Sequence, residues 1–155
     1  MSYVDNNLMQ DEQVVYRARI HWLIFLPGLF WLLAAAALAV GGLYIVYLPI
    51  AAAVALAVAL YHLLLAWIMR LSTELAVTSK RVILKQGLIK RDTHELNHSK
   101  VESFQVEQGI LGRIFDFGNL TIHGTGGGRT PIRHIEAPLE FRRRAMEAID
   151  ASQRA

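Results

Sequence analysis

The sequence predicts a membrane hairpin of two transmembrane α-helices, followed by a small antiparallel β-barrel that a C-terminal α-helix caps. Three observations lead to this fold class. Residues 20–69 carry no formal charge, the chain changes to short β-prone runs after Arg70, and apolar residues near the C-terminus repeat with a helical period. The predicted divisions are a leader over residues 1–19, the hairpin over 20–70 and one cytoplasmic domain over 71–155.

The composition agrees with this division. Hydrophobic residues make up 54% of the 155 residues and charged residues only 19%, whereas soluble proteins average about 45–50% apolar and about 25% charged residues. The chain has no cysteine, which excludes a secreted scaffold held by disulfides. The small size of the remaining domain argues against a large enzyme with a deep interior.

The uncharged stretch is long enough for two spans. The first covers residues 22–40, about 28 Å of helix at 1.5 Å per residue, which crosses a hydrocarbon core. Gly41 and Gly42 then loosen the helix, and Pro49 suits the first turn of a second helix that runs to Met69. A tight reversal over residues 41–49 therefore joins two predicted spans.

The flanking charges predict the orientation, because basic residues accumulate on the cytoplasmic side of a membrane. The turn over residues 41–49 has no basic residue, and the basic residues nearest to the two spans lie outside the hairpin: Arg17, Arg19, Arg70, Lys80 and Arg81. Both termini are therefore expected in the cytoplasm.

A cleaved signal peptide is the competing interpretation of the first span. Residues 37–39 read Ala-Leu-Ala, which resembles a cleavage site. The leader contains Asp5, Asp11 and Glu12, however, and a second span follows at once. Both features argue for a retained hairpin.

Small residues recur at four-residue spacing within the spans and allow helix backbones to approach closely. They are Ala35, Ala39, Ala51, Ala55 and Ala59. Either the two helices pack on one another there, or one face is left for another copy or a partner membrane protein. His21 and His62 are the ionisable groups nearest the bilayer; His62 is expected to hydrogen-bond between helices, with a proton or metal role as the alternative.

The domain after the hairpin has the pattern of short strands. Its β-prone runs cover residues 75–77, 82–84, 89–96, 101–106, 120–122 and 132–135, and turn signals separate them. Alternation is clearest where Phe104 and Val106 share one face, with Gln105 and Glu107 opposite. Several short strands with tight turns predict an antiparallel meander or barrel.

The C-terminal segment has a helical pattern instead. Pro138 suits a first helical turn, and one face then collects Phe141, Ala145, Ala148 and Ile149. Such a stripe needs a hydrophobic surface to cover. We expect this helix to close the open end of the barrel.

Four stretches of the domain together resemble a known family. They are residues 78–83 (TSKRVI), 87–91 (GLIKR), 96–108 (LNHSKVESFQVEQ) and 111–118 (LGRIFDFG). They are similar to the bacterial pleckstrin-homology-like (PH-like) family of the second type, in which such a domain commonly follows a pair of transmembrane helices. The resemblance covers about residues 71–149 and the hairpin. It implies a PH-like fold and a multi-pass protein of the bacterial inner membrane, but no mechanism.

No motif in the domain predicts an enzyme. The glycine-rich residues 124–130 fit neither a phosphate loop nor a dinucleotide loop, so they are expected to form a flexible hairpin loop from which Arg129 can reach an anionic group. His94, Glu95 and His98 lie in a strand and turn context, where residues four apart do not converge on a metal. Four serines lack a nucleophile signature: Ser72, Ser79, Ser99 and Ser103. Catalytic residues, metals and cofactors are therefore not expected.

The basic residues are the remaining candidates for a binding site. Those expected near lipid headgroups are Lys80, Arg81, Lys85, Lys90 and Arg91, with Arg129 as a further candidate. The alternative is that Arg81 and Arg91 pair with Glu74 or Glu95 and support the barrel. Residues 142–144 are all arginine. Successive residues of a helix point in different directions, so these arginines are expected to face solvent and not one common site. Nucleic-acid binding is disfavoured, because the aromatic side chains look like core: Phe104, Phe115 and Phe117.

These observations lead to two functional hypotheses. The first is a non-catalytic, membrane-anchored PH-like adaptor or accessory subunit that binds protein partners, either copies of itself or a larger inner-membrane complex. The second is the binding of anionic lipid headgroups by the basic hairpins of the domain. Membrane lipids and a protein partner are thus the expected partners.

Overall fold

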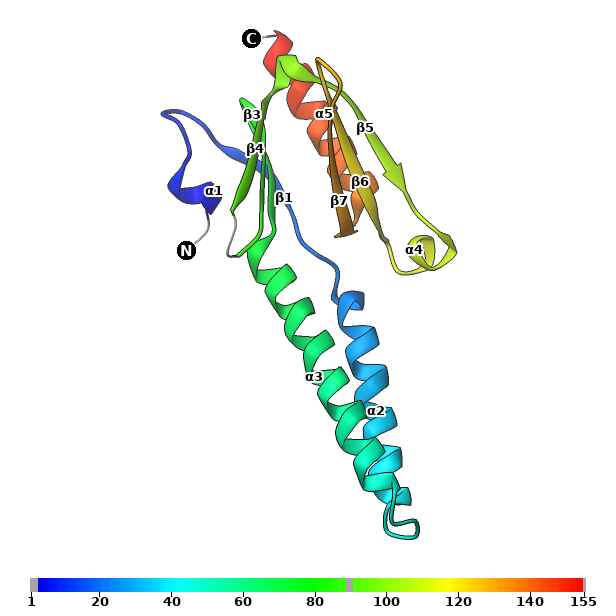
Figure 1. Ribbon diagram of the computed structural model, residues 1–155. Helices are drawn as coiled ribbons and strands as arrows, with labels where there is room; N and C mark the ends of the chain where they lie inside the picture. The colour runs from blue at the N-terminus through cyan, green and yellow to red at the C-terminus, as the bar shows by residue number, and fades with distance from the viewer. Residues whose placement is uncertain (1–2, 89–90, 155) are drawn as a thin grey trace. The chain divides into compact units, whose positions relative to one another are not determined.

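The computed structural model describes residues 3–88 and 91–154 and separates into two compact units (Figure 1). The hairpin unit is Trp22–Arg70. The second unit, which we call the domain, joins the residues up to His21 to those from Leu71 onward. The N-terminal residues, which the sequence suggests as a leader, therefore belong to the same compact unit as the C-terminal half of the chain.

The hairpin unit contains two long apolar helices. A 3₁₀ turn, η1 (Trp22–Phe25), leads into α2 (Leu26–Gly41), and α3 (Leu48–Ser72) follows the reversal. η1 together with α2 (Trp22–Gly41) and α3 are each long and apolar enough to cross a membrane, and only 11% and 17% of their most apolar stretches are buried. A core helix of a soluble protein would be mostly buried, so this exposure is the unusual property of the unit.

The two helices approach closely through small residues. A Cβ atom on Gly28 would lie 2.6 Å from Cγ of Leu63, which only a glycine avoids. Ala35, Ala55 and Ala59 are buried, whereas the predicted packing residues Ala39 and Ala51 are exposed. Residues at a strict four-residue spacing do not stay on one face of a helix with 3.6 residues per turn, because each is turned by about 40° from the one before. Ala52 is therefore buried in place of Ala51.

The domain holds two antiparallel sheets. The four-stranded sheet has the order β1 (Val14–Ala18), β2 (Glu74–Thr78), β3 (Arg81–Gln86), β4 (Asp92–Asn97), and the three-stranded sheet has the order β5 (Val101–Glu107), β6 (Phe117–Gly124), β7 (Gly128–Glu136). The short helices are α1 (Tyr3–Asn6), η2 (His98–Lys100) and α4 (Ile110–Ile114), and α5 (Pro138–Arg154) ends the chain.

The prediction of a barrel is wrong, because the two sheets do not close by strand pairing within the described residues. On one side, the isolated bridge between Ile20 and Ile135 is the contact that joins the sheets. On the other side, the chain leaves β4, turns through η2 and starts β5 in the other sheet. The antiparallel strands are as expected, but they form two layers.

Strand β1 is absent from the sequence prediction, although it forms an edge of the larger sheet. Ala18 pairs with Leu75 and Arg17 with Ala76, so the neighbours β1 and β2 are separated in sequence by the entire hairpin. Residues 14–16 are β-prone, but only pairing with a strand more than fifty residues away makes this short run a strand.

The main core lies between the two sheets and α5. Phe141 of α5 is fully buried and meets Tyr16 of β1 and Phe104 of β5 edge-on, with ring centroids 6.0 and 6.2 Å apart. Ala145, Ala148 and Ile149 lie on the same buried face. The predicted stripe of the terminal helix is thus confirmed, and its partner is the space between two sheets.

A second, smaller cluster covers the outer face of the four-stranded sheet. Val4 of α1 packs on Ala76 and Ile83, and the nearby side chains of Tyr3, Leu8 and Val14 pack against this cluster. The backbone N–H of Tyr3 also donates to Glu74 at 3.1 Å. The two central strands β2 and β3 are therefore covered on both faces.

The strand register defines two ends of the domain. The chain enters and leaves the hairpin beside Ile20 and Glu74, and we call this the hairpin end. Four strand pairs lie at this end of the two sheets: Lys85 with Glu74, Asp92 with Gln86, Glu136 with Phe117, and Asn119 with Glu107. The far end contains the β2–β3 turn, η2 and the glycine-rich loop between β6 and β7.

Candidate functional site

Arg81 lies at the centre of the most strongly connected polar cluster. Its guanidinium donates to both carboxylate oxygens of Glu12 at 2.9 Å, to Glu95 at 2.6 Å and to the carbonyl oxygen of Asn7 at 2.7 Å. The side chain of Arg81 is only 7% exposed and that of Glu12 is fully buried. A bidentate pair of this kind is strong only when every polar atom is satisfied.

The surrounding groups complete this cluster, which we call the Arg81 clasp. The hydroxyl of Thr78 donates to Glu12 at 2.6 Å, and the backbone N–H of Met9 donates to the same carboxylate at 2.7 Å. Burial alone would raise the pKa of Glu12, but the hydrogen bonds from Arg81, Met9 and Thr78 outweigh it and hold that pKa below its ordinary value. The clasp fastens residues 7–12 to the sheet.

The clasp removes Arg81 from the headgroup candidates. Its donors are used inside the protein, and its pairing with Glu95, which was the structural alternative, is confirmed. The main partner, Glu12, could not be recognised from the sequence because it belongs to the N-terminal segment. The acidic residues Asp11 and Glu12, just before a β-prone run, were the available signal.

The other headgroup candidates do not form one site. Lys80 lies at the far end, where its ammonium donates to the carbonyl oxygen of Gln10 at 2.7 Å. Lys85 lies at the hairpin end and pairs with Glu74 at 3.2 Å. The length of β3 separates the two ends by about 17 Å at 3.3 Å per residue.

Two further candidates are exposed at opposite ends. Arg91 precedes β4 at the hairpin end, and Arg129 lies near the start of β7 at the far end. Lys90 lies outside the described residues. The predicted set therefore divides into separate positions.

The remaining motifs occupy ordinary structural positions. The glycine-rich segment is the loop between β6 and β7, with Gly126 and Gly127 at φ values of +93° and +81° that favour glycine. His98 is buried, and its Nδ1 lies 3.0 Å from the Ser152 hydroxyl, whereas His94 is exposed on β4. Among the residues that the structure describes, no three His, Cys, Asp or Glu side chains gather as a metal ion would require.

The arginines of α5 form a solvated ladder. Glu140 accepts from Arg143 at 2.7 Å and from Arg144 at 2.9 Å, and all three side chains are at least one-third exposed. These ion pairs lie one helical turn apart, where such contacts stabilise a helix only slightly. They agree with the predicted solvated face.

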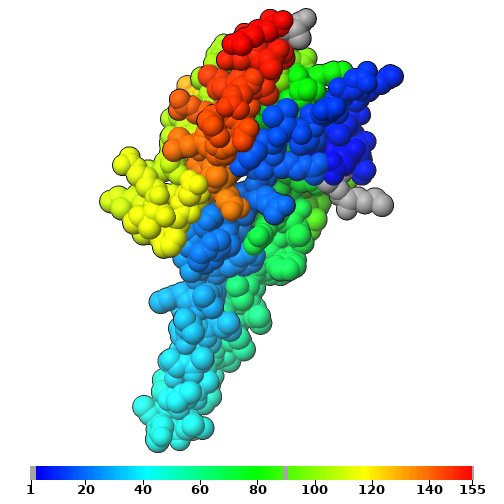
Figure 2. Space-filling view, turned by 180° about the vertical axis from the view of Figure 1, so that it is seen from behind, coloured from blue at the N-terminus to red at the C-terminus, as the bar shows by residue number. Residues whose placement is uncertain are grey.

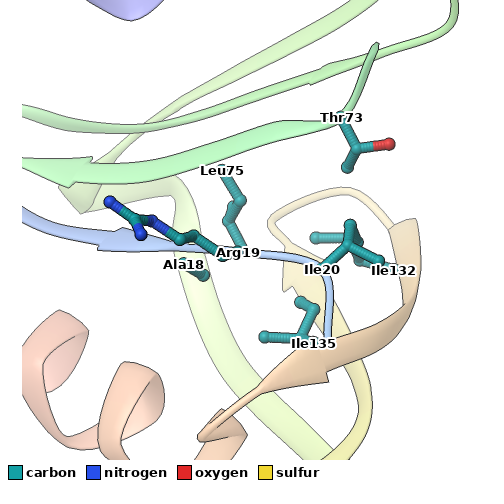
Figure 3. A pocket seen from close by; sticks show the side chains of 7 residues that line it. All are labelled: Ala18, Arg19, Ile20, Thr73, Leu75, Ile132 and Ile135. Carbon is teal, nitrogen blue, oxygen red and sulfur yellow. The ribbon is translucent and has the colours of Figure 1, made fainter. Parts of the chain in front are cut away.

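A shallow crevice opens at the hairpin end between β1, β2 and β7 (Figure 3). It measures about 170 Å³, much of it open to solvent, and its apolar wall includes Ile20, Ile132 and Ile135. In Figure 3 the guanidinium of Arg19 points away from these isoleucines. Almost none of this space is enclosed, so the crevice does not form a pocket for a typical ligand.

A protruding apolar surface is the other prominent feature. It consists of α4 and the residue after it, coloured yellow in Figure 2. Ile110, Leu111, Ile114 and Phe115 are 81%, 63%, 68% and 47% exposed. We call these four residues the α4 ridge.

The ridge corrects one prediction from the sequence. Phe104 is buried as expected, but Phe115 is exposed because α4 holds it outside the sheets. Phe117 is half-buried and its ring stacks on His21, with centroids 5.3 Å apart. Apolar residues at i, i+1, i+4 and i+5 directly after Gly109 are the signal that marks such a short helix face.

Comparison with known proteins identifies the class of this domain. The model of the bacterial PH domain family matches residues 22–149, which include the hairpin and most of the part of the domain that follows it. The chain therefore belongs to the bacterial PH domain family, and the resemblance of its motifs is confirmed. Neither a curated protein nor a solved structure gives a match to the chain.

The Arg81 clasp predicts a large loss of stability when its cation is removed. In Arg81→Met the apolar stem remains but Glu12 keeps a buried charge, so the free energy of unfolding should fall by about 3–5 kcal/mol. Urea denaturation of the full chain in a mild detergent, followed by the circular dichroism of the strands, measures this loss. The double variant Arg81→Met/Glu12→Gln should recover part of it, and Arg129→Met serves as the exposed control. Equal stability of Arg81→Met and the parent would contradict the clasp.

The clasp also predicts how stability depends on pH. Because the folded pKa of Glu12 lies below its ordinary value of 4.5, its contribution is fully present above pH 4.5 and is lost as the pH falls through the lowered value. Denaturation at several pH values should show a shallower decline below pH 4.5 in Glu12→Gln than in the parent. Glu147→Gln, which changes an exposed carboxylate, should keep the parental slope. A parental slope in Glu12→Gln as well would show that this carboxylate is not stabilised by folding.

Proposed function

We propose that this protein is a non-catalytic, membrane-anchored adaptor of the bacterial inner membrane, whose PH-like domain binds protein partners at the cytoplasmic face. The partners are further copies of the chain or a larger inner-membrane complex. The observation that supports this proposal is the exposure of the segments Trp22–Gly41 and Leu48–Ser72, whose most apolar stretches are only 11% and 17% buried. Two exposed apolar helices of this length need lipid or another apolar partner to cover them.

The sheet supports the proposed topology. Strands β1 and β2 are paired neighbours, and the hairpin unit connects them. This pairing favours a topology in which both ends of the apolar segment lie on the same side of a membrane, with an even number of crossings. With basic residues outside the hairpin, that side is the cytoplasm.

The domain favours recognition of a macromolecule over a small molecule. Its described crevice is small, whereas β4 and β5 are the outermost strands of their sheets. An extended segment of a partner can add to such an edge through backbone hydrogen bonds. The charged residues Asp92 and Glu95 on β4 suit an edge that must avoid unselective pairing.

Headgroup binding is the second candidate function. It is favoured by one observation: Arg91 is exposed at the hairpin end, where Lys85 also lies, paired with Glu74. A basic side chain near an anionic leaflet contributes about 1 kcal/mol, so a site of this size would be weak. If the domain has such a site, its binding to vesicles should increase with the fraction of anionic lipid and decrease as salt is added.

The topology can be tested with single cysteines, because the chain has none. In Ile45→Cys, which lies in the exposed reversal between the helices, the thiol should react with a membrane-impermeant reagent in intact spheroplasts. A reporter that is active only in the cytoplasm should give signal when fused after Ala155. A silent reporter together with an unreactive Cys at position 45 would invert the topology and refute the proposed site of action.

The adaptor proposal predicts an assembly in a mild detergent. The mass of the purified chain should exceed that of one protomer, or another protein should co-purify. Ala39→Leu, on the exposed face of α2, should lower the assembled fraction without loss of fold, whereas Ala35→Leu should destabilise the hairpin because Ala35 is buried. Size-exclusion chromatography with light scattering measures both. A lone protomer with no co-purifying protein would count against the proposal.

A further inference from the structure

The α4 ridge is held rigidly, although its side chains face outward. Gly112 is buried against the chain, where a Cβ atom would lie 2.5 Å from the carbonyl oxygen of Phe117. The amide of Gln108 donates to the carbonyl oxygens of Gly112 and Phe117 at 3.3 and 3.2 Å. The loop between β5 and β6 is therefore a fixed support, and the outward direction of the ridge is a property of the fold.

One helix face carries the whole ridge. Ile110 and Ile114 are four residues apart, as are Leu111 and Phe115, so the four side chains lie over one another in two adjacent rows. Gly112 occupies the side that packs on the domain. The result is a contiguous apolar surface, of the kind that marks an interaction site in a folded protein.

The ridge lies at the hairpin end of the domain. Helix α4 connects Glu107 to Phe117, and these two residues belong to the hairpin-end positions of β5 and β6. Two more exposed apolar residues lie at the same end: Leu88 follows β3, and Leu139 lies in the first turn of α5. By contrast, Met146 and Val15 are exposed singly, away from this end.

The connections to the two apolar helices are short. Residues 19–21 separate β1 from η1, and Thr73 alone separates α3 from β2. If the helices cross a membrane, the hairpin end of the domain must stay close to the interface. A short amphipathic helix at an interface buries its apolar side about 5–10 Å into the boundary between headgroups and acyl chains.

We propose that the α4 ridge inserts into the interface of the bilayer that holds the hairpin, as a second and non-spanning membrane contact of the domain. This inference rests on the proposed membrane anchoring. The partner of the ridge is the lipid itself, which the four apolar side chains contact at the boundary between headgroups and acyl chains. The ridge fixes the rotation of the domain at the membrane surface and so determines which strand edges face a partner.

The charges around the ridge distinguish this contact from headgroup binding. Arg113 on α4 is accompanied by exposed Glu107 and Asp116, so the surroundings carry both signs. Insertion should therefore persist in zwitterionic lipid and at high salt, whereas a basic headgroup site would lose its ligand under both conditions.

The test uses single cysteines labelled with a fluorophore in the full chain, reconstituted in phosphatidylcholine nanodiscs. Ile114→Cys reports on the ridge, and Leu64→Cys, on an exposed position of α3, reports on the anchoring. Thr125→Cys, in the exposed loop at the far end, is the matched control. Each label is challenged with lipids that carry a quencher on the acyl chain and with aqueous iodide.

The expected result is quenching of the labels at positions 114 and 64 by the lipid quencher, and of the label at position 125 by iodide. Quenching at position 114 should survive high salt and fall when Ile110 and Leu111 are both replaced by Ser, whereas Met146→Ser should leave it unchanged. Lipid quenching at 64 with iodide quenching at 114 would overturn the ridge contact and leave the anchoring intact.

Two other outcomes also decide the matter. A label at position 114 that is shielded from both quenchers would show that a protein, such as a second copy, covers the ridge, and would overturn the lipid contact. The absence of lipid quenching at position 64 would refute the proposed anchoring, and the ridge contact with it.

Discussion

The pairing of β1 with β2 is the constraint on which the rest of the structure depends. Ala18 and Leu75 are neighbours across one ladder, yet the hairpin unit lies between them in the sequence. The apolar helices thus occupy the place of a turn between two strands. The four-stranded sheet cannot be completed until both helices have been synthesised. A non-local contact of this kind carries a loop-closure cost that local hairpins such as β2–β3 do not have.

The Arg81 clasp and the outer hydrophobic cluster keep the N-terminal segment in place despite that cost. The clasp uses a buried ion pair whose polar atoms are satisfied by Glu12, Glu95 and Asn7. Val4 adds apolar contact with Ala76 and Ile83. Together they turn the central strands into a layer that is covered on both faces, which explains why consecutive residues of β2 and β3 are buried. A buried charge network stabilises such an arrangement only while it is complete.

The surfaces of the domain, more than its interior, determine the function that we propose. The space between the sheets is filled by Phe141 and its neighbours, and the crevice beside Ile20 is small. The features left for recognition are the outer strands β4 and β5, the exposed helices of the hairpin unit and the α4 ridge. All of these suit extended partners such as a peptide, a second membrane protein or a lipid surface. This is consistent with membership of the bacterial PH domain family, although a fold by itself does not define a partner.

The sequence alone determined the features that depend on neighbouring residues. Apolar stretches of about twenty residues, short β-prone runs between turn signals and the stripe from Phe141 to Ile149 are local patterns. They correctly predicted two long apolar helices, short antiparallel strands and the terminal helix. Tertiary structure decided what depends on distant partners. Val14–Ala18 became a strand only through β2, Arg81 was removed from the solvent by Glu12 of another segment, and Phe115 was turned outward by the support of Gln108 and Gly112. The physical reason is that a side chain's type limits what it can contact, whereas its burial and its partner are fixed only when segments far apart in the sequence meet.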